Sequence, residues 1–194
     1  MNLTSQQLKQ EESNYIINPK KFVLWLFIVA SLMLFAGFTS AYIVRRGDGN
    51  WEFFNLPNAF AINIIIALIS SVFMQTAYYM AKKDNIKMLK NFLLLTLGSA
   101  IAFLIIQLIG WQELTSNNVY FAFSNPSNSF VYVISGVHFV HVIGGLVFIL
   151  ATTIQAFRFK VHKTNLLLIN MCTTFWHFLA AMWIYLYVFM YIYR

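Results

Sequence analysis

Three histidines are the side chains of this sequence best suited to chemistry. His138 and His141 stand three residues apart in one apolar stretch, and His177 stands in another. A spacing of three places two side chains on one helix face. Imidazoles there could ligate haem iron or a transition metal, or respond to protons, whereas the alternative is that they donate hydrogen bonds between helices. The spacing alone leaves both interpretations open.

The surrounding sequence favours the structural alternative. Two histidines on one helix cannot clamp a haem from opposite faces, and a metal site wants at least three convergent ligands. The one cysteine, Cys172, provides neither a disulfide framework nor a cysteine metal motif. We therefore predict no catalytic and no metal-binding residue. A three-nitrogen site would require His177 to face the other two histidines across the bundle.

Acidic side chains are missing from the apolar stretches. All six lie outside these stretches or at their edges: Glu11, Glu12, Asp48, Glu52, Asp84 and Glu113. Intramembrane acids usually carry proton and ion pathways, so the chain alone is a poor candidate for a pump or an ion-coupled carrier. The amides Asn63, Gln75 and Gln107 are expected to join neighbouring helices.

The elements that must position these side chains are membrane-spanning helices. Of the 194 residues, 60% are hydrophobic and 10% are charged, against about 25% charged in a soluble domain. Each apolar stretch reaches the ~20 residues that a helix needs to cross a bilayer. The stretches are 22–44, 59–81, 91–112, 131–157 and 165–193. The sequence thus predicts an all-α integral membrane protein, a bundle of five transmembrane helices. Its three prolines lie outside these stretches, so continuous helices are expected.

Basic residues predict the orientation of the bundle. The 13 Lys and Arg residues, against six Asp and Glu, flank the apolar stretches instead of forming one patch, which argues against nucleic acid as a partner. Ten of them fall on the side of the amino terminus. Because cytoplasmic loops carry the excess of Lys and Arg, we expect the polar segment 1–21 to be cytoplasmic and the carboxyl terminus to lie outside.

Two segments carry a family resemblance. SGVHFVHVIGG at 135–145 and FWHFLAAMWIYLYVFMYIY at 175–193 resemble subunit III of the haem-copper terminal oxidases, and SLMLFAGFTSAY in the first stretch is similar to a helix of that family. The matching motif positions, expected to serve packing and the subunit interface, are His138, His141, Gly145, Trp176, His177 and Trp183. The resemblance covers 22–194 as one transmembrane domain, in the five-helix form of bacterial members.

The resemblance implies a subunit without redox centres in a proton-pumping cytochrome c oxidase of aerobic respiration, with no active site of its own. Haem and copper would reside in partner subunits I and II, and bound phospholipid and a respiratory supercomplex are further expectations. The chain would lie in the bacterial cell membrane and support the catalytic subunit structurally and in lipid, proton or oxygen access. The alternatives are subunit III of a quinol oxidase, or a free-standing transporter or haem anchor using the histidines.

The sequence also departs from the family. Leu32, Asn170 and Ala180 stand where members commonly have acids. Their loss argues against a proton-antenna or carboxylate-gating role within this chain. Arg158 and Lys160, at the expected cytoplasmic edge, could instead hold an anionic lipid headgroup, the alternative being plain topology signalling.

Overall fold

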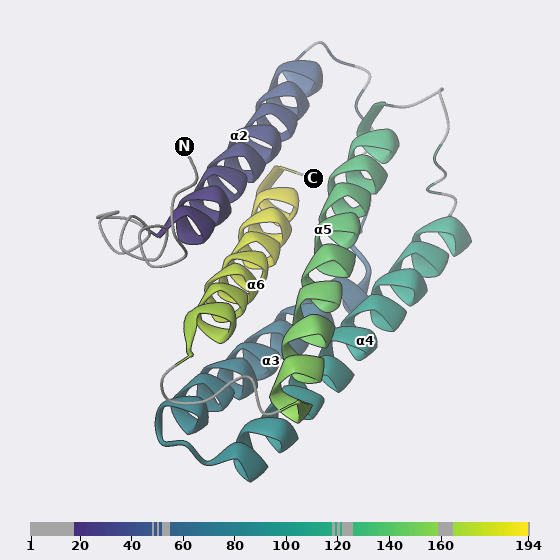
Figure 1. The fold of residues 1–194 in the computed structure, drawn as a ribbon. Coiled ribbons are helices and arrows are strands. Elements are labelled where there is room, and N and C mark those ends of the chain that lie inside the picture. Colours follow the sequence, from purple (N-terminus) through teal and green to yellow (C-terminus); the bar gives the residue numbers. More distant parts are fainter. Residues whose placement is uncertain are drawn as a thin grey trace, which may run out of the picture.

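The computed structural model describes residues 18–47, 49, 51, 55–117, 119, 121, 126–158 and 165–193. Within them the chain forms long α-helices that are apolar enough to cross a membrane. They are α2 (Pro19–Gly47), α3 (Asn58–Lys82), α4 (Ile86–Ser116), α5 (Pro126–Phe157) and α6 (Leu167–Tyr193) (Figure 1). The prediction of an all-α membrane bundle with five helices is therefore confirmed.

The helices extend beyond most of the predicted apolar stretches. Helix α4, for example, begins at Ile86, five residues before its stretch, because lysines such as Lys87 continue a helix while their charged ends reach water. Pro19 and Pro126 are the first residues of α2 and α5 and precede the apolar stretches, so neither interrupts a membrane-spanning segment, as predicted. The backbone N–H at the first helical position has no partner within a helix. Proline, which lacks this N–H, therefore costs no hydrogen bond there. The helices remain continuous, as expected.

Four of the helices form a ring. Helix α3 packs against α4, α4 against α5, α5 against α6, and α6 against α3, with successive helices running in opposite directions (Figure 1). Across the described residues, α3 and α5 make no helix-to-helix contact, so they stand diagonally opposite each other. Helix α2 lies outside the ring, and of the described helices it packs against α5 and α6.

Aromatic side chains fill the centre of the ring. Trp183 of α6 is fully buried; its ring meets Phe60 of α3 at 5.5 Å and Phe103 of α4 at 5.4 Å, both edge to face. Edge-to-face pairs at such distances are favourable beyond their buried area. The core thus sits among α3, α4, α5 and α6.

Helix α2 buries a single stripe of residues. The buried positions are spaced three or four residues apart, which keeps them on one helix face: Ile28, Ser31, Phe35, Thr39 and Tyr42. The remaining α2 surface is apolar and exposed, with Met33 71% and Trp25 57% accessible. This helix is therefore attached to the ring by one face only.

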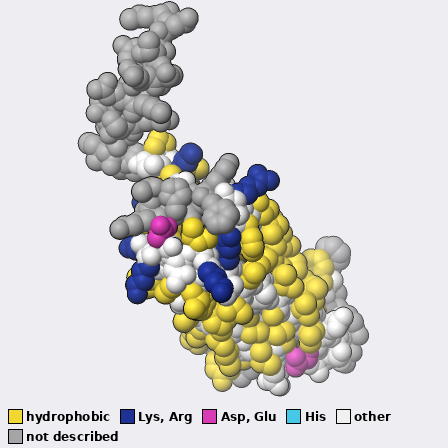
Figure 2. All heavy atoms as spheres, turned by 60° about the horizontal axis from the view of Figure 1, so that its bottom comes forward, with side chains coloured by type: hydrophobic (Ala, Val, Ile, Leu, Met, Phe, Trp, Pro, Cys, Tyr) yellow, Lys and Arg dark blue, Asp and Glu magenta, His cyan; other side chains and the backbone are white. Residues whose placement is uncertain are grey.

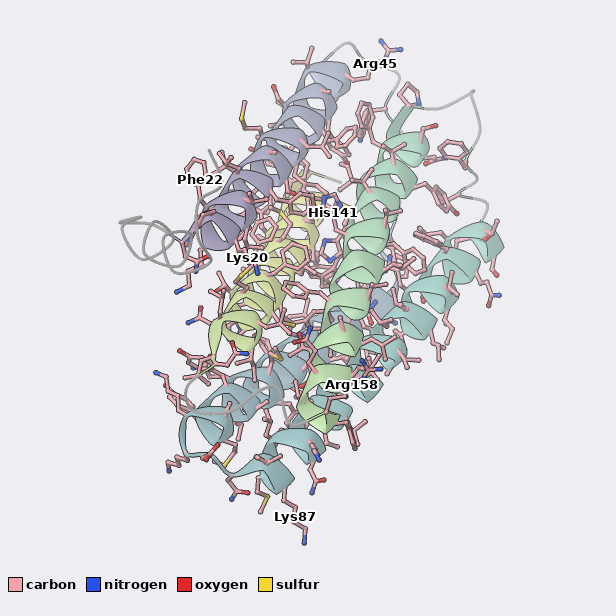
Figure 3. The ribbon with its side chains drawn as sticks, viewed as in Figure 1. Lys20, Phe22, Arg45, Lys87, His141 and Arg158 are labelled. Atoms are coloured by element: carbon pink, nitrogen blue, oxygen red, sulfur yellow. The ribbon has the colours of Figure 1, made fainter. Side chains whose placement is uncertain are left out.

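The surface of the bundle separates apolar and basic regions. Figure 2 shows a continuous apolar surface with Lys and Arg side chains gathered towards one end. The exposed basic side chains towards that end are Lys20, Lys82, Lys83, Lys87 and Arg158. Figure 3 shows Lys87 and Arg158 towards the lower end of the bundle and Arg45 at the upper end of α2. An apolar wall bounded by charge is what a bilayer-spanning bundle requires.

Candidate functional site

His177 joins α6 to α3 through two hydrogen bonds. Its Nε2 lies 2.9 Å from the Gln75 side-chain oxygen, and its Nδ1 is hydrogen-bonded to the Ser71 hydroxyl. The amide oxygen only accepts, so Nε2 carries a proton, and in the neutral ring Nδ1 accepts from Ser71. Both nitrogens of this half-buried ring are therefore occupied by the neighbouring helix.

His141 joins α5 to α2. Its Nδ1 donates to the Val137 carbonyl at 2.8 Å, one turn earlier on the same helix, and its Nε2 lies 3.3 Å from the Ser31 hydroxyl of α2. Its ring also packs against Phe27 and Phe35, with centroids 6.0 and 5.4 Å away. Figure 3 shows His141 between α5 and the neighbouring helices. The predicted interhelical hydrogen bonds are thus confirmed for His141 and His177.

His138 differs from both. It is 1% exposed, and neither of its ring nitrogens has a hydrogen-bond partner in the part of the chain that the structure describes. The ring instead stacks on Trp183, with centroids 5.1 Å apart, and meets the edge of Phe103 at 6.0 Å. An interhelical hydrogen bond was expected for His138 as well. That expectation is wrong, because aromatic rings surround His138 where a polar partner would be needed: Phe35, Phe103 and Trp183.

The three histidines bond to different helices. Through their hydrogen bonds His177 faces α3 and His141 faces α2, whereas His138 points among aromatic rings. Among the described residues, no three His, Cys, Asp or Glu side chains come together as a metal site would require. The histidines instead connect neighbouring helices.

The remaining motif residues meet where α5 and α6 cross. Trp176 donates from Nε1 to the Ser70 hydroxyl of α3 at 3.0 Å. Gly145 lies so close to α6 that an added Cβ would sit 2.6 Å from Leu179 Cδ1 and 3.1 Å from the Trp176 ring. A side chain at this position would require Leu179 and the Trp176 ring to shift, so glycine allows the two helices this close contact.

Amides provide a further link that the sequence predicted. Asn63 of α3 donates from Nδ2 to the Gln107 side-chain oxygen of α4 at 2.9 Å, and both residues are fully buried. Gln75 contributes its bond to His177. The three intramembrane amides therefore connect α3 to its two neighbours in the ring.

At three positions the resemblance leads one to expect acids. Leu32 is 47% exposed and lines a groove between α2 and α6, and Asn170 donates from Nδ2 to the Tyr78 hydroxyl of α3 at 3.2 Å. Ala180 lines the buried cavity next to His138. Apolar and amide side chains thus occupy places where acids would need charged partners.

Grooves on both sides of α2 are lined almost entirely by apolar side chains. One, of about 400 Å³, lies between α2 and α6; the other, of about 440 Å³, lies between α2 and α5. Sequence reasoning did not identify these grooves, because they depend on how far α2 stands from the ring. Arg158 is exposed at the end of α5, whereas Lys160 lies outside the described residues.

Comparison with known proteins agrees with this picture. Residues 49–194, which include α3, α4, α5 and α6, match the family model described as cytochrome c oxidase subunit III. The chain is 30% identical to the cytochrome bo(3) ubiquinol oxidase subunit 3 of Buchnera aphidicola over 184 residues, 90% of this chain and 94% of that one. It is 24% identical to a probable quinol oxidase subunit 3 of Staphylococcus saprophyticus over 180 residues, 90% of this chain and 89% of that one. It is 25% identical to the cytochrome c oxidase subunit 3 of Corynebacterium diphtheriae over 174 residues, 86% of this chain and 84% of that one.

Proposed function

This chain belongs to the cytochrome c oxidase subunit III family, and we propose that it supports the catalytic subunit of a haem-copper terminal oxidase without carrying redox centres itself. The observation that carries the proposal is the family match, which includes the entire ring of helices. The subunit would act by packing: the histidines, amides and tryptophans hold helices to one another and leave an apolar outer wall for lipid and for a partner subunit.

The partners in this proposal are subunits I and II of the oxidase. Subunit I would hold haem and copper and reduce oxygen, subunit II would carry copper, and the assembled enzyme would couple electron transfer to proton translocation. The apolar exposed face of α2, with Met33 and Trp25, is suited to contact either lipid or a membrane-embedded partner. A supercomplex with other respiratory enzymes would be built on this assembly.

We further propose that the amino terminus is cytoplasmic and the carboxyl terminus lies outside. The exposed side chains Lys20, Lys87 and Arg158 lie towards the same end of the bundle, the one that contains the starts of α2 and α4 and the end of α5. The positive-inside rule places that end in the cytoplasm. Segment 1–21 would then precede the membrane domain 22–194 on the cytoplasmic side.

The electron donor has two candidates. Cytochrome c is the donor expected from the sequence resemblance, and the description of the matching family names it. Quinol is favoured by the 30% identity to the Buchnera aphidicola ubiquinol oxidase subunit, of which the match covers 94%. The site that accepts electrons from the donor would belong to another subunit. Identifying the subunits that copurify with this chain therefore distinguishes cytochrome c from quinol.

Bound phospholipid fits the apolar grooves beside α2. An acyl chain would lie against side chains such as Phe27 and Phe175, and an anionic headgroup would pair with Arg158 at the basic end. In the Arg158→Ala variant of the purified complex we expect the bound anionic phospholipid, measured by mass spectrometry, to fall by about one molecule per complex. An unchanged phospholipid content would assign Arg158 to topology alone.

The decisive test is purification of the tagged chain from its native membrane in mild detergent, with an untagged strain as the control. We expect a coloured complex whose visible spectrum shows haem and whose mass spectrum shows a large catalytic subunit and a copper-binding subunit. Oxygen consumption with reduced cytochrome c or with quinol then identifies the donor. A colourless protein without partners would overturn the proposal and favour a free-standing transporter or haem anchor.

A further inference from the structure

A small cavity lies at the centre of the ring of helices. It offers about 20 Å³ to the centre of a water molecule. All four ring helices contribute to its wall, and most of the wall is apolar, including Phe103, Val142 and Leu179. A cavity needs about 10–15 Å³ measured in this way to hold one water molecule.

Polar groups that lack partners line this cavity. His138, from α5, is 1% exposed and has two ring nitrogens without a hydrogen-bond partner among the described residues. Ser70, from α3, is also 1% exposed; its oxygen accepts from Trp176 Nε1 at 3.0 Å, which leaves its own hydroxyl proton to be donated. A buried polar atom without a partner is costly, so native structures rarely leave one unpaired.

A third polar group completes the set. Ser99, from α4, donates to the Leu95 carbonyl at 2.8 Å and keeps the lone pairs of its oxygen for a donor. His138, Ser70 and Ser99 all line the one cavity, although they come from three different helices. A buried water typically makes about three hydrogen bonds, and these groups supply two acceptors and one donor.

We propose that this cavity binds an ordered water molecule that links His138 of α5 to Ser70 of α3 across the diagonal of the ring. In the arrangement that these groups allow, the Ser70 hydroxyl donates to the water, and the water donates to the unprotonated ring nitrogen of His138 and to Ser99 Oγ. One of the two unpartnered His138 nitrogens thereby gains a hydrogen bond. Because α3 and α5 make no helix-to-helix contact in the described part of the chain, the water would provide the polar connection between them.

The direct test is a high-resolution structure of the purified protein with its native partners. We expect density within hydrogen-bond distance of both a His138 ring nitrogen and Ser70 Oγ. Absence of density there, at a resolution where other buried waters are visible, would overturn the proposal. So would a His138 ring rotated onto a protein acceptor, or uptake of xenon at this position, because xenon fills dry apolar cavities.

Radiolytic labelling gives a second, independent readout, since water next to a buried side chain promotes its oxidation by hydroxyl radicals. Trp183 lines the cavity, whereas Met190 lies further along the same helix and is not in the cavity wall; both are 0% exposed. After correction for intrinsic reactivity, Trp183 should be labelled several-fold faster than Met190. In His138→Phe this difference should disappear. Equal labelling in the unmodified protein, or a difference that survives in His138→Phe, would contradict the water site.

Discussion

Helices α6 and α2 show two different ways of holding a helix in a membrane protein. Helix α6 is enclosed on several sides, and Trp176, Leu179 and Trp183 are buried among three other helices. Helix α2 is attached by one stripe, along which hydroxyl groups at Ser31, Thr39 and Tyr42 bond to α5 or α6. Because lipid is as apolar as the helices, packing and hydrogen bonds replace the hydrophobic effect in joining them. We infer that α6 is held by packing on several sides together with hydrogen bonds from Trp176 and His177 to α3, whereas α2 depends on the contacts of one stripe alone.

The largest expected effect follows from removing the ring at the centre of the bundle. Trp183→Ala should destabilise the subunit by about 3–5 kcal/mol, the usual cost of deleting a buried aromatic side chain. The readout is retention of the subunit in the purified oxidase during heating, with the haem spectrum unchanged. Val188→Ala is the control on the same helix, where the side chain is 45% exposed. Equal losses from both variants would contradict the inference that buried packing holds α6.

Closing the contact between α5 and α6 should have the next largest effect. Gly145→Val places atoms where Leu179 and the Trp176 ring already lie, and overpacking of this kind costs about 1–3 kcal/mol. Gly144→Val is the control, because nothing lies within 4 Å of a Cβ added there. Thermal dissociation of the complex compares the two. If Gly144→Val were as harmful as Gly145→Val, valine itself and not the crowded contact would be the cause.

Loss of His141 should separate α2 from the ring without disturbing α6. His141→Ala removes the contact with Ser31 and the packing against Phe35, worth about 1–2 kcal/mol together. Hydrogen exchange should rise along α2 while α6 stays protected and the haem absorption of the complex stays constant. Val140→Ala, at a side chain 65% exposed on the same helix, is the control. If the His141→Ala complex kept its full amount of this subunit but its haem absorption changed, the packing role of His141 would be contradicted.

The smallest effect is expected at the end of α2 near Gly47. Tyr42→Phe deletes the hydrogen bond from the Tyr42 hydroxyl to the Tyr193 carbonyl, 3.2 Å long, and interhelical hydrogen bonds in membranes average about 0.6 kcal/mol. We expect faster exchange in the last turn of α6 only. Tyr79→Phe, at a ring 52% exposed on α3, should leave that exchange unchanged. No change in Tyr42→Phe would show that ring packing alone holds this end.

The sequence predicts the number and character of the helices because a bilayer imposes a length on each apolar stretch. It predicts the ends less well: α4 and α5 both begin five residues earlier than their apolar stretches. The limits of the apolar core mark where a helix leaves hydrocarbon, whereas capping groups such as Asn85, which accepts from the Met88 amide, mark where it begins.

The sequence predicted those features of the candidate site that can be read from one helix at a time. The motif spacing identified His141 and His177, and the amides were expected to join helices, as they do. The unpartnered nitrogens of His138 depend on which helices stand diagonally in the ring, and one helix's periodicity carries no such information. The grooves beside α2 depend on helix separation in the same way.

The isolation of α2 from α3 and α4 has a consequence for biogenesis. Among the described helices it packs against α5 and α6, and about 120 residues separate the end of α2 at Gly47 from the start of α6 at Leu167. At translation rates of about 5–20 residues per second, α2 is complete roughly 6–24 s before its last neighbour begins to emerge. Until α5 has been made, α2 must persist in the bilayer without either of the helices that it contacts in the bundle. Its largely apolar surface suits it to wait there until the rest of the chain has been made.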